Sequence, residues 1–129
     1  MKEDLNKWEK LFIDYLQLTD FKLVANNGSF SLIDLLGCNF CNIESDKFEY
    51  AYDVLVRLTP YEYDHIISNI EYELEKQGIQ YDYDYNQPQS LLQYRSLLKN
   101  YQYWFDYIEM IYYHPDDINL SKIYNKLYA

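Results

Sequence analysis

Acidic side chains recur at helical spacing between residues 59 and 78. At about 100° per residue, Asp64, Glu71 and Glu75 fall on one side of a helix, opposite an apolar stripe. Carboxylates can replace phosphates as acceptors for arginine and lysine, and they bind arginine through two parallel hydrogen bonds. Tyrosine adds apolar area with a polar tip, which suits anchors at protein interfaces. These residue types favour recognition of a cationic surface.

The acidic face breaks two local rules of helix stability. Glu71 and Glu75 are like charges four residues apart, which costs roughly 0.2–0.5 kcal/mol, and Glu75 lies near the helix end where the dipole prefers cations. Violations without local compensation indicate function, and the alternative is an ordinary solvated face in an acidic protein. The candidate partner-binding residues are Tyr61, Asp64, Glu71, Tyr72, Glu75, Asp82 and Asp84.

Two short motifs could bind metals, and both are incomplete. Cys38 and Cys41 form a C-x-x-C pair in acidic surroundings, which favours structural or incidental thiols over a redox or zinc role. Residues 82–86 match the opening of a calcium loop, but Gln87 and Gln93 replace its glycine and its bidentate glutamate. We expect neither a metal nor a cofactor.

The sequence contains no catalytic motif and only three glycines, so a phosphate-cradling loop is hardly available. His65 lies away from the apolar stripe and reads as a surface residue, although neighbouring carboxylates would allow it to act as a base. We therefore expect a protein that is not an enzyme.

Charge excludes further classes of function. The 129 residues carry a net charge of −10, and residues 44–84 hold eleven acids against three bases, a net charge of −8. Binding of nucleic acid or an anionic membrane needs clustered lysine and arginine, so a basic protein partner fits better. No apolar run approaches the roughly 18 residues of a membrane span, and the N-terminus is too polar for a signal peptide. We expect one cytoplasmic domain, residues 1–129.

The first half of the chain reads as a helix followed by strands. Apolar spacing predicts a helix over residues 3–18 and a strand over 21–25. Asn27 and Gly28 are typical of a hairpin turn, with a return strand over 30–36 that could instead form a helical turn. We expect a loop at 37–46. Alternation over 48–58 favours a strand, and the alternative is a helix that turns Phe48, Tyr52, Leu55 and Thr59 inward.

The second half positions the acidic residues. Thr59, Pro60 and Glu62 predict the start of a helix near residues 60–77, and Gly78 predicts its end. Its buried stripe should be Tyr63, Ile66, Ile67, Ile70 and Leu74. Alternating tyrosines and aspartates predict a fourth strand over 79–85, with the tyrosines facing the core. A long helix near 90–113, assigned to 91–113, and a short helix over 118–128 complete the chain.

These elements define an α+β fold: a small, mostly antiparallel sheet of three or four strands with helices packed on it. The sequence IYYHPDD at residues 111–117 resembles the Tyr-Tyr-Pro recognition stretch of colicin-type nuclease immunity proteins. The resemblance covers seven residues, His114 is inserted before Pro115, and the predicted strands depart from that all-helical family. No residue role is carried over from it.

We expect an acidic inhibitor that occupies the basic nucleic-acid-binding surface of a nuclease or another DNA- or RNA-binding protein. Its composition is similar to that of phage and mobile-element proteins that mimic DNA and disarm restriction or CRISPR nucleases, and to that of immunity proteins. The alternative is a small scaffold or assembly protein that forms a homodimer through residues 91–113.

Overall fold

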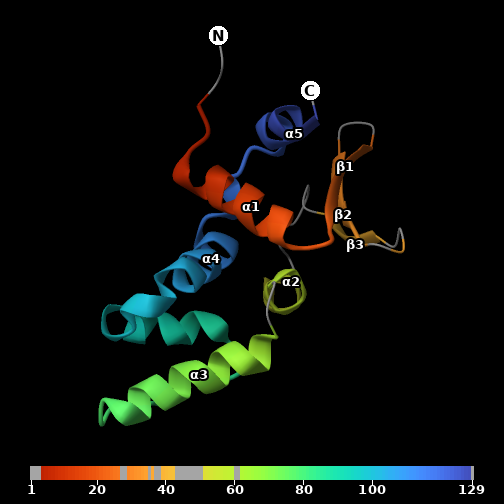
Figure 1. Ribbon diagram of the computed structural model, residues 1–129. Coiled ribbons are helices and arrows are strands. Elements are labelled where there is room, and N and C mark those ends of the chain that lie inside the picture. Colours follow the sequence, from red (N-terminus) through yellow and green to blue (C-terminus); the bar gives the residue numbers. More distant parts are fainter. Residues whose placement is uncertain are drawn as a thin grey trace.

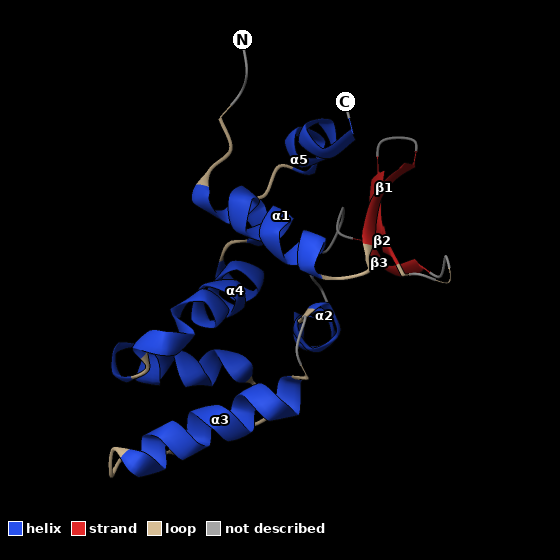
Figure 2. Ribbon diagram, in the orientation of Figure 1, coloured by secondary structure: helices blue, strands red, loops and turns tan. Residues whose placement is uncertain are grey.

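Helices make up most of the chain, and a small antiparallel sheet stands to one side of them (Figures 1 and 2). The computed structural model describes residues 4–26, 29–34, 36, 39–42, 51–59 and 62–128. The α-helices are α1 (Lys7–Leu18), α2 (Ala51–Leu58), α3 (Tyr63–Lys76), α4 (Gln102–Tyr113) and α5 (Leu120–Tyr128). The 3-10 helices are η1 (Pro88–Leu97), η2 (Lys99–Tyr101) and η3 (Pro115–Asp117). Mixed helix and sheet is the predicted α+β class.

Helix α1 begins where a capping box fixes its first turn. The Asn6 side chain accepts the backbone N–H of Glu9 at 2.8 Å, and the Glu9 carboxylate accepts the backbone N–H of Asn6 at 2.9 Å. The predicted helix over 3–18 is confirmed from Lys7 onward, and its apolar side, including Phe12 and Tyr15, is buried in the core.

The predicted hairpin is present. Strand β1 (Lys22–Asn26) pairs antiparallel with β2 (Ser29–Ile33), with Lys22 opposite Ile33. The turn residues Asn27 and Gly28 lie outside the described part of the chain. A short strand β3 (Asn39–Asn42) adds to β2, so the predicted loop over 37–46 is wrong at these four residues.

The strand predicted over 48–58 is wrong, because residues 51–58 form α2. Their alternation also contains a helical pattern, and packing against α4 selects the helix. Val54 and Leu55 are buried, and Thr59 donates a hydrogen bond to the carbonyl of Leu55. The inward positions of Leu55 and Thr59 match the helical alternative, while Phe48 lies outside the described residues.

Helix α3 carries the predicted stripe, since all five predicted apolar residues are buried. Its start differs from the prediction. The Thr59 hydroxyl bonds to Leu55 of α2 instead of capping α3, and Glu62 is the N-cap residue, with no side-chain capping bond. Pro60 is outside the described residues. Gly78 adopts a φ of 75°, and Ile79 N–H bonds to Leu74 O at 2.9 Å, so the helix ends in a Schellman turn.

The predicted strand over 79–85 is also wrong. These residues run without a strand partner after the turn at Gly78 and pack along α3. The backbone of Asp82 bonds to a side chain: the Tyr94 hydroxyl accepts its N–H at 2.7 Å and donates to its carbonyl at 3.1 Å. Side chains from η1 therefore replace the expected neighbouring strand.

The long helix predicted over 91–113 is divided into η1, η2 and α4. The chain leaves helical geometry at Leu98 (φ −126°, ψ 68°), and η1 folds back against α4. Arg95 then reaches Asp106 and Glu109, and Gln102 Nε2 donates to the carbonyl of Arg95 at 2.6 Å. The apolar residues of this segment are therefore distributed over η1, η2 and α4. The continuous helix over residues 91–113, through which the homodimer alternative would form, is not present.

The C-terminal helix is present as α5, with Ile118 and Ile123 buried. Helix α5 packs against β1, and α1 packs against α4. In Figure 1, α3 lies at the opposite end of the molecule from α5. A hydrophobic cluster joins residues from α1, β1, β2, α2, α3, η1, α4 and α5, and it leaves one side of α3 exposed.

Candidate acidic groove

An open groove runs between α3 and the segment 79–85. Its volume is about 520 Å³, within the range of roughly 300–1,000 Å³ that small ligands occupy. Carboxylates, phenol rings and two small or apolar α3 side chains line it: Asp64, Ile67, Ser68, Glu71, Tyr81, Asp82, Tyr83 and Tyr85. We call these eight residues the acidic groove. The Schellman turn at Gly78 forms it by directing the chain back along α3.

Tyrosine hydroxyls of the returning segment meet carboxylates of α3. Tyr81 donates to Glu75 Oε1 at 2.8 Å, and Tyr85 donates to Asp64 Oδ1. Alternate residues of an extended chain advance by about 7 Å, close to the roughly 6 Å between Glu71 and Glu75, which are four residues apart on α3. Asp64 is seven residues from Glu71, about 10.5 Å along the helix, and the Tyr85 hydroxyl reaches it. The tyrosines at 81, 83 and 85 therefore follow the acidic side of α3 in antiparallel order, and Glu71 lies beside the middle one.

The carboxylates change the titration of these tyrosines. The hydrogen bond to Glu75 is the largest cause that raises the pKa of Tyr81 to about 12, with smaller contributions from burial and the charge of Glu71. Burial and then the charge and hydrogen bond of Glu71 raise the pKa of Tyr83 to about 12. The hydroxyls therefore remain protonated donors near neutral pH, and the groove keeps the negative charge of its carboxylates.

The structure brings three of the predicted partner-binding residues into this groove: Asp64, Glu71 and Asp82. Glu75 lies beside them and accepts the Tyr81 hydroxyl. Asp84 is exposed outside the lining, and its carboxylate accepts the backbone N–H of Asn86 at 2.9 Å, which closes a local turn.

The two predicted tyrosines are not part of the groove as described. Tyr72 is 62 % exposed on α3, but it does not line the groove. Tyr61 lies outside the described residues. The tyrosines that line the groove follow Gly78. Tyr81 and Tyr83 also pack against the hydrophobic core, as predicted, whereas Tyr85 is exposed. A signal in the sequence could have identified these groove tyrosines. They alternate with other residues after a helix-ending glycine, and acids are spaced along that helix.

The acids around the groove have no cationic partner among the described residues. In the part of the chain that the structure describes, Asp64, Glu71, Glu75, Asp82 and Asp84 pair with no lysine or arginine. Arg95 instead binds Asp106 and Glu109, and Lys122 binds Glu9. Neutral tyrosine donors therefore offset the repulsion between Glu71 and Glu75. These donors do not neutralise the negative charge of the carboxylates.

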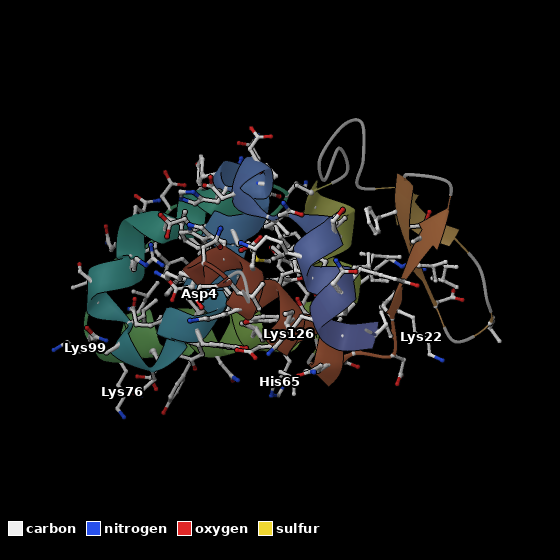
Figure 3. All side chains as sticks on the ribbon, turned by 90° about the horizontal axis from the view of Figure 1, so that it is seen from above. Asp4, Lys22, His65, Lys76, Lys99 and Lys126 are labelled. Carbon is white, nitrogen blue, oxygen red and sulfur yellow. The ribbon has the colours of Figure 1, made fainter. Side chains whose placement is uncertain are left out.

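Other motifs contribute less. His65 is exposed, and it projects outward from α3, as does Lys76 near the end of that helix (Figure 3). Across the described ranges, no group of three or more His, Cys, Asp and Glu side chains is arranged to hold a metal ion. Cys38 lies outside those ranges, and Cys41 is in β3. Among the described helices, none has the length and apolar character needed to cross a membrane.

The fold and groove define an α+β protein with an anionic, tyrosine-lined surface. Comparison with protein-family models, with curated proteins and with solved structures finds no match to this chain.

Proposed function

We propose that this protein is a non-enzymatic, acidic inhibitor that binds a basic nucleic-acid-binding protein, such as a nuclease, through the acidic groove and the acids beside it. The carboxylates of α3 and of residues 79–85 take the places of nucleic-acid phosphates against arginine and lysine. Such a role in the cytoplasm is that of anti-restriction, anti-CRISPR or nuclease-immunity proteins of phages and mobile elements.

The observation that carries this proposal is a set of carboxylates, exposed except for the half-buried Glu71, that have no cationic partner among the described residues. Asp64, Glu71, Glu75, Asp82 and Asp84 gather on α3 and the segment beside it, and no described lysine or arginine pairs with them. A basic partner would gain these interactions on binding, and the net charge of −10 would accelerate the encounter.

Hydrogen bonds within the protein preorganise this surface. Tyr81 and Tyr85 hold the carboxylates of Glu75 and Asp64, while the backbone of Asp82 is fixed by Tyr94. Groups that are ordered before binding lose less conformational entropy when a partner arrives.

The proposal is tested by capture of basic nucleic-acid-binding proteins on the immobilised full chain at about 0.05 M and 0.3 M salt. The expected result is capture at low salt, competition by added duplex DNA and at least about tenfold weaker binding at high salt. The double variant Glu71→Lys, Glu75→Lys should abolish capture. Asp14→Lys, Asp20→Lys is the control, because it changes the net charge equally at two exposed acids of α1 and the residues just after it.

Capture that is indifferent to salt and DNA, or that is lost equally in the control variant, would contradict the proposal. Loss in the control would mean that net charge, rather than this surface, determines binding.

A further inference from the structure

One wall of the acidic groove combines a carboxylate with a partly exposed aromatic ring. The Tyr85 hydroxyl donates to Asp64 Oδ1, and Tyr85 as a residue is 41 % exposed. Tyr63 contacts this ring edge-on, with centroids 5.4 Å apart and an interplanar angle of 75°, and donates to the Tyr85 carbonyl at 3.1 Å. Ring and carboxylate are thus held side by side before any ligand arrives.

The carboxylate keeps capacity for another donor. An ionised carboxylate offers about four lone-pair positions, and Asp64 gives one oxygen to Tyr85. Glu71 and Asp82 line the same groove, and none of the eight lining residues is basic. The complement to this site is a cationic side chain from another molecule, because no lysine or arginine in the described ranges pairs with these carboxylates.

A guanidinium fits this pairing better than an ammonium. Guanidinium is planar, stacks on aromatic faces and presents donors in a fixed fork that matches a carboxylate. Ammonium is a compact and strongly hydrated point charge, so it gains less from a neighbouring ring and loses more hydration. A carboxylate already favours guanidinium through paired hydrogen bonds, and a neighbouring ring increases this preference through stacking.

We propose that the acidic groove seats an arginine side chain of the partner, with its guanidinium against the Tyr85 ring and hydrogen-bonded to Asp64, in the field of Glu71 and Asp82. This inference rests on the proposed function in one respect: the arginine belongs to the basic protein that the acidic surface binds. It adds that the groove selects arginine over lysine.

The test titrates the full chain with three blocked single amino acids, N-acetyl-arginine amide, N-acetyl-lysine amide and N-acetyl-citrulline amide, followed by NMR of the tyrosine rings. The arginine probe should shift the Tyr85 and Tyr83 ring signals and bind about tenfold more tightly than the lysine probe, because only guanidinium both stacks and forms paired hydrogen bonds. The neutral citrulline probe should cause no saturable shift.

Variants locate the site. Tyr85→Leu and Asp64→Asn should each weaken binding of the arginine probe about fivefold or more, while Tyr85→Phe keeps the ring and should bind more tightly than Tyr85→Leu. Tyr113→Leu and Asp20→Asn are the controls, because they remove an exposed ring and an exposed carboxylate elsewhere. Circular dichroism verifies that each variant is folded.

Equal binding of arginine and lysine probes, or equal losses in the control variants, would overturn the arginine site. Salt-dependent capture of a basic protein would still stand in that case, so the two proposals fail separately. Conversely, selective arginine binding at Tyr85 without capture of any nucleic-acid-binding protein would keep the site and reject the proposed function.

Discussion

Glu71 is the residue on which the acidic groove depends most. Its charge and hydrogen bonding contribute to the raised pKa of both Tyr81 and Tyr83. The repulsion between Glu71 and Glu75, a cost in an isolated helix, is tolerated because tyrosine donors approach both carboxylates. A phenol can stabilise a carboxylate by a hydrogen bond without cancelling its negative charge. A lysine at the same place would cancel that charge.

Replacing this charge should be visible in the tyrosine titration. Both tyrosines have a pKa raised from 10.0 to about 12, so their contribution to stability is complete below pH 10 and is lost as pH rises through about 12. In Glu71→Gln, the pKa of Tyr83 and, less strongly, that of Tyr81 should fall toward 10. NMR of the ring carbons measures this, and Glu62→Gln, an exposed acid before α3, is the control. Unchanged titration in Glu71→Gln would place the cause elsewhere.

At the scale of elements, a single carboxylate joins α1 to α5. Glu9 is almost fully buried, and besides closing the α1 capping box it accepts the Asn119 N–H at 2.9 Å and binds Lys122 at 3.3 Å. The spacing of Asn6 and Glu9 is a capping-box signature that the sequence contains, but the partners from α5 are more than a hundred residues away. This contact holds the two ends of the chain together.

The Glu9 contact predicts a pH-dependent stability. Burial alone would raise the pKa of Glu9, but the two backbone N–H donors and Lys122 bring it below 4.5. A lowered pKa stabilises the fold above the unfolded value and loses this contribution as pH falls through the lower, folded value. Glu9→Gln should therefore reduce the free energy of unfolding at pH 7 by about 2–4 kcal/mol and flatten its decline as pH falls below the unfolded value of 4.5.

Chemical denaturation at several pH values measures this effect, with Glu62→Gln as the exposed control. A Glu9→Gln protein with wild-type stability and the same slope at low pH would show that the buried carboxylate contributes nothing to joining α1 and α5.

At the scale of the molecule, charge is unevenly distributed. The last 45 residues hold four acids and four bases, and the ion pairs of Arg95 lie there, whereas residues 44–84 carry −8. The carboxylates of the acidic groove repel one another in the folded state. Under the proposed function, this negative surface would orient the molecule toward a basic partner.

This distribution predicts that salt stabilises the protein. Raising the ionic strength from about 0.02 M to 0.2 M at pH 7 should increase the free energy of unfolding, because screening weakens exposed repulsion more than the partly buried pairs. The double variant Asp82→Asn, Asp84→Asn preserves side-chain shape and should respond less. Thermal and urea unfolding measure both proteins, and a wild type that loses stability with salt would show that attraction, not repulsion, dominates its surface.

Local patterns predicted some elements well. The stripe from Tyr63 to Leu74 and the hairpin of β1 and β2 depend on neighbours in sequence, so periodicity and turn residues predict them. Residues 51–58 fit both a strand and a helix, and contact with α4 decided between them. The four residues of β3 carry no strand pattern of their own and are defined only by pairing with β2.

The sequence by itself determined which side of α3 is buried, where that helix ends and where the negative charge is concentrated, because burial patterns, a glycine in left-handed geometry and charge are local properties. Only the tertiary structure decided that the chain after Gly78 returns along α3 without a strand partner and that residues 91–113 fold back at Leu98. These outcomes depend on bonds from Tyr94, Gln102 and Arg95 across the fold. The contacts of Tyr81 with Glu75 and of Tyr85 with Asp64 also depend on the tertiary structure. Each hydroxyl reaches its carboxylate only once the chain has turned back along α3.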